Sequence, residues 1–460
     1  MFGNTIGFRY SPLLLFFLLL VILSACTQPL PSKQPPPPSS DPVVSWIKQH
    51  AHPLTTTLPE GSDTDLALLP QIIGQASIVG LGEETHGTHE FIDMKARLVE
   101  FLISKMGFTT FVMENNWGSS QLLDASINGG PGPLTSVMTQ SLFGSWQTQE
   151  YQALLEWMRT YNANLAHPAK IHFLGMDIQA LSHSDFSTVE NYVQRVDQEH
   201  AATVHKLYAP LVEKSSLASL QDYFALSAST KQQYQDQAQQ VYTLLQTNHQ
   251  RDIAHSSESQ FAFALQNARI IAQFTTYANA STQTEQLAHF YQRDTFLAEN
   301  VAWIYEHAAG SRPKIMVWAH DGHIANITTY GSLDGRNLGG ELHARYQQSY
   351  LALGTTLFQG TFRIYAASPS TSIQTIAPAP STTYNYTLGQ AGLPLYLLDV
   401  RTLPSGAVSN WAKSSSTFLL YGLGGEDLSG SAQLDQWFDV LLHIQNTTPS
   451  HSFYASAGSG

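Results

Sequence analysis

The sequence has very few cysteines and few charged residues. Cys26 is the only cysteine among 460 residues, so no disulfide can form within the chain and a buried core must hold the fold. Charged residues make up 12% of the chain, with 22 Lys and Arg against 35 Asp and Glu. The formal net charge of -13 argues against nucleic acid as a partner, because phosphate backbones are bound by clustered basic residues. With 43% hydrophobic residues, the chain can bury the core of one large domain.

Two common catalytic signatures are missing as well. No GxSxG pattern occurs, so covalent serine catalysis lacks its usual sign, although it is not excluded. No HExxH zinc motif is present either, since His89-Glu90 is followed by Phe-Ile-Asp. Neither a serine hydrolase nor a zinc protease is therefore indicated by its motif.

The N-terminal segment has the pattern of export and anchoring. One basic residue, Arg9, precedes an apolar run from Leu13 to Leu23, which suits a signal peptide and is too short to span a bilayer comfortably. The run ends in Leu-Ser-Ala-Cys, which resembles the bacterial lipobox, so Cys26 is predicted to carry a lipid anchor. The alternative is a signal peptide with an incidental cysteine. We expect residues 1–25 to be removed and the protein to be a membrane-anchored lipoprotein of the cell envelope, outside the cytoplasm.

A proline- and serine-rich stretch follows the predicted anchor. Because Gln28–Pro42 cannot form a helix interior, residues 26–45 are predicted to be the anchor and an extended tether. The folded domain is expected over residues 46–448. Residues 449–460 are expected to form a disordered tail.

Short apolar runs rich in β-branched residues recur after the tether, and patterns of helical period lie between them. This alternation predicts an α/β fold with a mainly parallel central sheet flanked by helices, one of them at Glu90–Met106. The segment 186–307, which is rich in Gln, Ala, Leu and Tyr, is predicted to be a helical insertion covering the active-site edge of the sheet. Strands are expected at 76–81, 109–113, 171–176, 314–318, 350–358, 395–400, 417–421 and 440–444.

Ionisable residues follow each of the four strongest strands. They are Glu83, Glu84, His86 and His89, then Glu114, then Asp177, and finally His320, Asp321 and His323. Because the carboxyl ends of parallel strands meet at one edge of a sheet, these residues are expected to converge there. Taken singly, each has a simpler explanation as a cap, a turn former or a helix-terminal residue. Together they indicate a site, because clustered charges at one edge are costly unless they serve a function.

Hydrolysis by an activated water is the chemistry that this set permits. An imidazole can take a proton from water while a neighbouring carboxylate fixes its tautomer, and His86 beside Glu83 or Glu114 fits that role. His320, on the opposite side, could hold the substrate carbonyl or protonate the leaving group.

Metal binding is the main rival to this interpretation, because the clustered histidines and carboxylates are also ligand types. The same residues are also compatible with a different class of protein, an anchored lipoprotein that binds a metal or a haem-type group without turnover. Chelator-resistant ester cleavage would favour the enzyme, whereas bound metal or an absorption spectrum would favour capture.

Four sequence blocks resemble the signature blocks of the erythromycin esterase family. They are GLGEETHGTHEF at 80–91, FVMENNW at 111–117, GMDIQ at 175–179 and VWAHDGHIA at 317–325. The resemblance runs from about residue 72 to residue 444 and includes the lesser blocks at 154–162 and 293–304. It implies hydrolysis of macrolide lactones, with neither a metal nor another cofactor.

The resemblance also implies roles for single residues. It makes His86 the general base, Glu83 and Glu114 its supporting carboxylates, and His320 the second histidine. The residues expected to bind the substrate are His323, His89, Asp177 and Arg293.

Glu84 departs from the family pattern, which usually has a small residue at this position. If Glu84 faced the cleft, it would raise the pKa of the His86 imidazole and could attract a cation.

From the residue cluster and the family resemblance, we expect a hydrolase of a small carboxylic ester or macrolactone, with erythromycin-like macrolides as one substrate class. The oligomeric state is not indicated.

Overall fold

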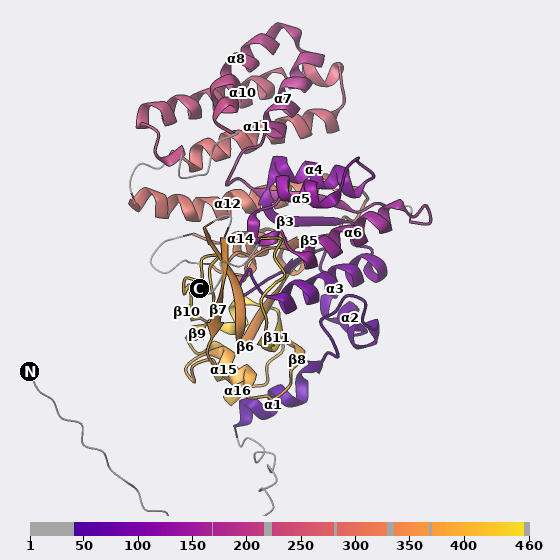
Figure 1. Cartoon of the computed structure of the whole chain (residues 1–460), viewed down its shortest axis with the longest axis vertical. Helices are drawn as coiled ribbons and strands as arrows, with labels where there is room; N and C mark the ends of the chain where they lie inside the picture. The colour runs from indigo at the N-terminus through magenta and orange to yellow at the C-terminus, as the bar shows by residue number, and fades with distance from the viewer. Residues whose placement is uncertain are drawn as a thin grey trace, which may run out of the picture. The chain divides into compact units, whose positions relative to one another are not determined.

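The computed structural model describes residues 41–167, 169–215, 223–279, 283–328, 335–367 and 370–454. In that part of the chain, helices flank a central sheet, which confirms the predicted α/β class (Figure 1). The predicted signal peptide, Cys26 and the tether up to residue 40 lie outside the described residues. The folded unit begins at Asp41.

The central sheet of the described part has nine strands and is mainly parallel. In spatial order the strands are β1 (His52–Pro53), β8 (Leu395–Asp399), β11 (Val440–Thr447), β6 (Tyr350–Ala367), β2 (Ile78–Leu81), β5 (Ile315–Trp318), β3 (Thr110–Asn116) and β4 (His172–Asp177), while β7 (Ser370–Ile376) pairs with β6. The strands from β11 to β4 in this order run parallel to one another, whereas β8 pairs antiparallel with β11 and β1, and β7 pairs antiparallel with β6. β2 and β5 lie in the middle and are buried along their whole length, as expected for apolar strands covered on both faces.

Helices cover both faces of the sheet. Those outside the segment 183–307 are α1 (Pro42–His50), α2 (Leu69–Ile73), α3 (His89–Met106), α4 (Trp117–Ile127), α5 (Leu134–Ser141), α6 (Gln149–Ala163), α13 (Asp321–Ile324), α14 (Leu338–Tyr346), α15 (Tyr384–Gly389), α16 (Ala407–Lys413) and α17 (Leu434–Trp437). Alternate residues of one strand point to opposite layers, so Val112 belongs to one apolar cluster and Phe111 to the other. The sheet therefore lies between two cores.

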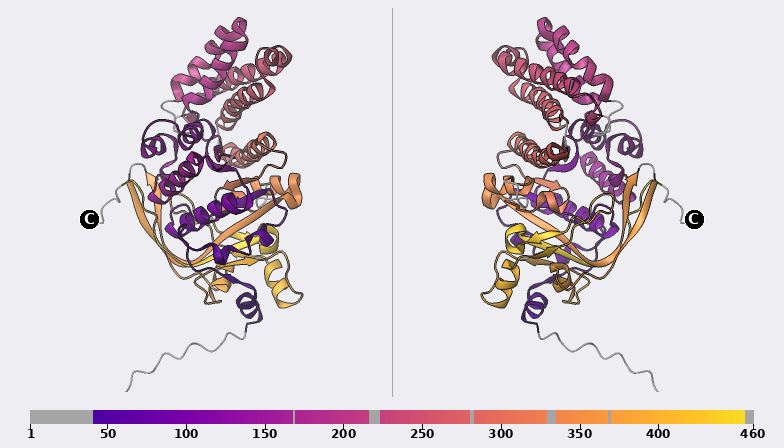
Figure 2. Two further views of the ribbon diagram at one scale, coloured as in Figure 1. Left: turned by 90° about the vertical axis from the view of Figure 1, so that its right-hand side faces the viewer. Right: turned by 90° about the vertical axis from the view of Figure 1, so that its left-hand side faces the viewer.

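The segment 183–307 is helical and stacks largely on itself. It contains α7 (His183–Val196), α8 (Gln198–Ser215), α10 (Ala228–Ala254), α11 (Glu258–Tyr277) and α12 (Gln283–His307). Helices α7, α8, α10 and α11 contact one another, and the group meets the rest of the fold through α4 and α12 (Figures 1 and 2). Of these helices, α12 makes the main contact with the sheet, at β4. The last helix of the segment therefore lies against the strand-end residues.

Three boundary predictions need correction. The side chain of Asp41 caps α1 and Pro42 occupies the first turn, so residues 42–45 are helical and not tether, because proline is tolerated at a helix start. Residues 449–454 are placed against the fold rather than forming a tail, since Pro449 and Ser452 bridge to the segments that precede α3 and α6. The rest of the predicted tail lies outside the described residues. The predicted strand at 417–421 pairs as β9 (Ser416–Phe418) with β10 (Gly430–Ala432) in a separate two-stranded sheet.

Candidate active site

The loop after β2 carries a close histidine–carboxylate pair. Nδ1 of His86 lies 2.6 Å from Oε1 of Glu83. The loop is fixed to the loop after β5, because the backbone N–H of Asp321 donates to the carbonyl of Glu83 at 2.8 Å. Since β2 and β5 are parallel neighbours, the sheet itself brings these two loops together.

The carboxylate of Glu83 is held in its ionised form. Burial alone would raise its pKa, but Lys95 and His86 bring the pKa below its ordinary value. Nζ of Lys95 lies 3.1 Å from Oε2 of Glu83 and 4.0 Å from the ring centre of Trp318, whose indole N–H donates to the same oxygen at 3.2 Å. An ionised Glu83 can only accept, so the Nδ1–H of His86 is the donor.

His86 is thereby left with one ring nitrogen for chemistry. Among the residues that the structure describes, none forms a hydrogen bond with Nε2 of His86. The His86 side chain is 11% exposed, so water can reach it while its partner Glu83 stays buried. This arrangement suits a general base whose tautomer is set by a carboxylate.

His320 lies beside His86 as a neutral donor. The two ring centres are 5.0 Å apart. Nδ1 of His320 accepts the N–H of Gly322 at 3.1 Å, so the ring proton is on Nε2, which lies 3.2 Å from the carbonyl of Tyr421. Burial, with His86 close by, lowers the pKa of His320 to about 3. A neutral imidazole N–H can donate to a substrate oxygen but is a poor source of a full proton.

Glu114 supports the site without bonding His86. Its Oε2 accepts the backbone N–H of His320 at 3.0 Å, and its Oε1 lies 2.9 Å from Nη2 of Arg293 and 3.2 Å from Nε2 of His323. Burial would raise the pKa of Glu114, but His323 and Arg293 hold it well below its ordinary value. Of the two carboxylates predicted to support His86, Glu83 is the one in direct contact and Glu114 fixes the neighbouring loop.

The remaining predicted residues of this group form a buried ionic network. Arg293 of α12 binds Asp177 through Nε at 2.9 Å and through Nη2 at 2.6 Å, and Nδ1 of His323 lies 2.6 Å from Asp294. Arg293 thus forms ion pairs with both Asp177 and Glu114, and in this way it connects α12 to the ends of β3 and β4.

His323 is expected to make stability depend on pH. Burial would lower its pKa, but Asp294 and Glu114 raise the pKa from 6.5 to about 10. Because the folded pKa is the higher one, the protonated ring contributes stability that is fully present below pH 6.5 and is lost as pH rises through about 10. Denaturation of the wild type and of His323→Gln should differ most at the acidic end of this window. A difference that grows with pH would contradict the assignment of a protonated His323.

Glu84 points away from His86. Its carboxyl accepts the N–H of Leu357 at 2.6 Å and the side-chain amide of Asn385 at 3.0 Å. Burial, with Asp321 nearby, raises the pKa of Glu84 well above its ordinary value. Glu84 therefore connects the loop to β6 and α15.

Glu84→Gln is predicted to be mild. Burial favours the uncharged form of Glu84 and its carboxyl contacts Leu357 and Asn385, so the variant should keep its hydrolytic activity and change stability by at most about 1 kcal/mol. Glu114→Gln, which removes an ionised partner of Arg293, should cost about 3–5 kcal/mol. Urea denaturation of the two variants checks the contrast, and equal losses would refute it.

His89 lies in a different cluster from His86. Its Nδ1 is 2.7 Å from Oε1 of Glu150, and its ring meets that of His451 edge-on at 4.8 Å. The structure does not bring His89 into hydrogen-bond contact with Glu83, Glu114 or His320 in the part of the chain that it describes.

Sequence reasoning missed Lys95, Trp146, Tyr151 and Trp318. The ring of Trp146 lies 5.0 Å from that of His86, and Tyr151 lies 5.0 Å from Trp318. The indole N–H of Trp146 and the hydroxyl of Tyr151 are buried without a hydrogen-bond partner in the described structure. Aromatic residues on helical segments usually indicate core packing, so the sequence pattern does not indicate a role for Trp146 and Tyr151. Their unpartnered N–H and O–H groups are the feature that makes them candidates for contact with a substrate.

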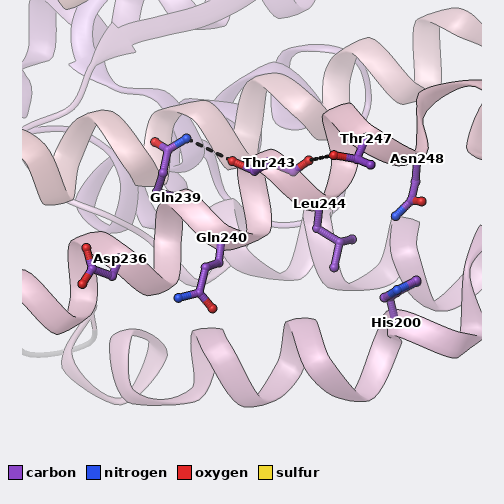
Figure 3. A pocket seen from close by; sticks show the side chains of 8 residues that line it. All are labelled: His200, Asp236, Gln239, Gln240, Thr243, Leu244, Thr247 and Asn248. Atoms are coloured by element: carbon purple, nitrogen blue, oxygen red, sulfur yellow. Dashed lines mark hydrogen bonds between the residues drawn. The ribbon is translucent and has the colours of Figure 1, made fainter.

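A hollow lies away from these residues, between α8 and α10. It has a volume of about 640 Å³ and is lined by His200, Asp236, Gln239, Gln240, Thr243, Leu244, Thr247 and Asn248 (Figure 3). Gln239 and Thr247 bond to Thr243 along the same helix. None of the predicted site residues lines this hollow.

Comparison with known proteins gives consistent matches. The family model described as Erythromycin esterase matches residues 103–447. Erythromycin esterase type II of Escherichia coli is 25% identical over 334 residues, covering 68% of this chain and 77% of that protein. A crystal structure named as a succinoglycan biosynthesis protein is 32% identical, with a TM-score of 0.77, covering 89% of this chain and 97% of the other. The structure of an erythromycin esterase mutant in its open conformation is 17% identical with a TM-score of 0.70, covering 87% and 98%, and shows the shared fold.

Proposed function

Since the chain belongs to the erythromycin esterase family, we propose that it hydrolyses a carboxylic ester or macrolactone with a water molecule activated by His86. The observation that carries the proposal is the contact of 2.6 Å between Nδ1 of His86 and the buried, ionised Glu83. It leaves Nε2 as the one ring nitrogen able to take a proton.

The reaction follows from these contacts. Nε2 of His86 takes a proton from water as the oxygen attacks the carbonyl carbon, and Glu83 stabilises the imidazolium that forms. The oxygen that gains negative charge accepts hydrogen bonds from neutral donors. Trp146 and His320 each have such a donor near His86, with His320 first leaving the carbonyl of Tyr421. When the carbon–oxygen bond to the leaving alkoxide breaks, the imidazolium returns its proton to that alkoxide, which gives an acid and an alcohol.

The charge balance of the site supports catalysis without a metal. Glu83 is paired with Lys95, and Glu114 is paired with Arg293 and His323. Within the described residues, the groups of three whose ligand atoms lie close enough to hold an ion do not include His86. The carboxylates here are therefore satisfied by the chain's own cations.

The names of the relatives define the substrates to test. One relative is named an erythromycin esterase and another a succinoglycan biosynthesis protein, so the substrate panel holds erythromycin-like lactones and simple carboxylic esters. We propose that the substrate is a small ester or lactone, and that erythromycin-like macrolides are the first substrate class to test.

Mass spectrometry of such a panel tests the proposal. The full chain, incubated with a chelator, should add one water to at least one ester or lactone, and His86→Gln should not. If no compound gains a water molecule, or if cleavage stops with the chelator and returns with a metal, the proposed reaction is wrong. A metal or haem-type absorption without turnover would instead support ligand capture.

We further propose that Cys26 anchors the protein in the cell envelope. The support is the lipobox-like pattern before Cys26 and its place as the only cysteine. In the described part of the chain, no helix is both long and apolar enough to cross a membrane. If Cys26 carries the lipid, Cys26→Ala should abolish labelling by a fatty-acid analogue and reduce the share of the protein in the membrane fraction. Absence of fatty-acid labelling in the wild type, or labelling that persists in Cys26→Ala, would exclude a lipid on Cys26 as the anchor.

A further inference from the structure

A second group of ligand-type side chains lies outside the catalytic pair. His89 begins α3, Glu150 is in the first turn of α6, and His451 follows β11. Nδ1 of His89 and Nδ1 of His451 lie 2.7 Å and 2.6 Å from the same oxygen of Glu150. The three ligand atoms all lie within 4.8 Å of one another.

The surroundings of these three side chains match those of a metal site. Nε2 of His89 lies 3.2 Å from Asp93, so the ring can donate its outer N–H to a carboxylate while Nδ1 faces the cluster. Metal-bound histidines usually make such a second contact, which fixes their tautomer. Glu150 is itself held, because it accepts the backbone N–H of His451 at 3.0 Å.

The cluster is both acidic and accessible. Asp93 and Glu150 bring two carboxylates to two imidazoles, and Glu90 next to His89 adds a third. The side chain of His451 is 57% exposed and that of His89 is 26% exposed. An ion can therefore enter and keep an open position for water.

We propose that His89, Glu150 and His451 bind a divalent transition-metal ion, with Zn²⁺ as the best match. Two imidazole nitrogens and one carboxylate oxygen form a common protein ligand set for Zn²⁺, with water as the fourth ligand. The ion displaces the proton that each imidazole donates to Glu150, and these protons pass to the solvent. The N–O spacings of 2.7 and 2.6 Å widen to roughly 3.3 Å, the separation of two ligands on a tetrahedral Zn²⁺.

The site lies next to the catalytic loop but is separate from it. The backbone N–H of Ser450 donates to the carbonyl of Gly87 at 2.9 Å, and Thr88 bridges to Pro449. An ion here joins the C-terminal segment to the starts of α3 and α6. It therefore stiffens the loop that carries His86 without taking part in the reaction.

A second cluster in the described structure provides the matched control. Asp197, Glu199 and His200 are also close enough to hold an ion. Asp197, however, already pairs with the guanidinium of Arg251. A resident cation makes this group a poor metal site, so His200→Ala should not change Zn²⁺ binding.

Titration of the full chain with Zn²⁺, and with Co²⁺ as a spectroscopic probe, tests the proposal. We expect one equivalent to bind, with the visible absorption of imidazole-bound Co²⁺ and a higher melting temperature. His451→Ala should weaken binding at least about 100-fold and Asp93→Asn by about 10- to 100-fold, while His200→Ala binds as the wild type does. Failure of the wild type to bind Zn²⁺, or unchanged binding by both His451→Ala and His89→Ala, would overturn it. These measurements do not use hydrolysis, so they stand or fall apart from the proposed reaction.

Discussion

Replacing His86 by alanine is expected to lower kcat/KM for the ester or lactone about 10²- to 10⁴-fold, the usual contribution of a positioned general base. Glu83 cannot take over, because it is buried and held by Lys95 and the indole of Trp318. His320 cannot take over either, because its Nδ1 accepts from Gly322 and its pKa is about 3. The rate constants from initial-rate kinetics on the best substrate of the panel give the comparison.

His205 offers a matched control for this substitution. It lies in α8 with a side chain that is 74% exposed, and within the described part of the chain its ring lies 3.0 Å from the carboxylate of Glu190. His205→Ala should therefore keep the wild-type rate. A loss of less than about 10-fold in a folded His86→Ala variant would mean that His86 is not the base.

Replacing Arg293 by methionine is expected to cost about 3–5 kcal/mol of folding stability, a loss as large as that predicted for Glu114→Gln. The change leaves Asp177 and Glu114 buried without the cation that joins them. Removing one member of a buried ion pair is costly because the remaining charge cannot regain its water. Urea denaturation followed by circular dichroism measures the effect.

Arg269 provides the matched control for Arg293. It pairs with Glu299 at 2.7 Å, with both side chains about one-third exposed. Arg269→Met should cost no more than about 1 kcal/mol, because exposed pairs contribute little. Equal losses in the two variants would show that the network around Arg293 is not needed for the fold.

The strand positions could be predicted because β2, β3, β4 and β5 are short apolar runs buried on both faces. A periodicity argument detects such runs directly, and the parallel arrangement then brings their polar ends together. The structure places His86, Glu114 and His320 close together, as that argument requires. Which of these side chains contact one another could not be predicted, because hydrophobic periodicity gives no side-chain orientation in the loops that follow the strands.

Glu83 and Glu84 illustrate that limit. Adjacent in sequence, they differ because one faces Lys95 and the other faces Asn385 of α15, about three hundred positions away. Lys95 itself was missed because a lysine within a helix usually indicates a solvent-exposed face, whereas here its amine is fully buried against Glu83. Likewise, His89 follows His86 by three residues, yet α3 starts between them and turns His89 toward Glu150.

The C-terminal segment was misjudged for a related reason. Its small and polar residues lack any apolar period, so composition predicts a tail. The structure instead holds residues 449–454 through backbone hydrogen bonds to Gly87 and Gln147 and through His451 on Glu150. Contacts made by backbone groups with distant segments leave no pattern in the sequence.

A double-mutant cycle on Glu83 and His86 tests most directly whether the two side chains act as one unit on water. Initial rates are compared for the wild type, Glu83→Gln, His86→Ala and the double variant. If the carboxylate works only through the imidazole, adding Glu83→Gln to His86→Ala lowers the rate no further. Losses that multiply in the double variant would mean that the two residues contribute independently, and the account given for this site would then be wrong.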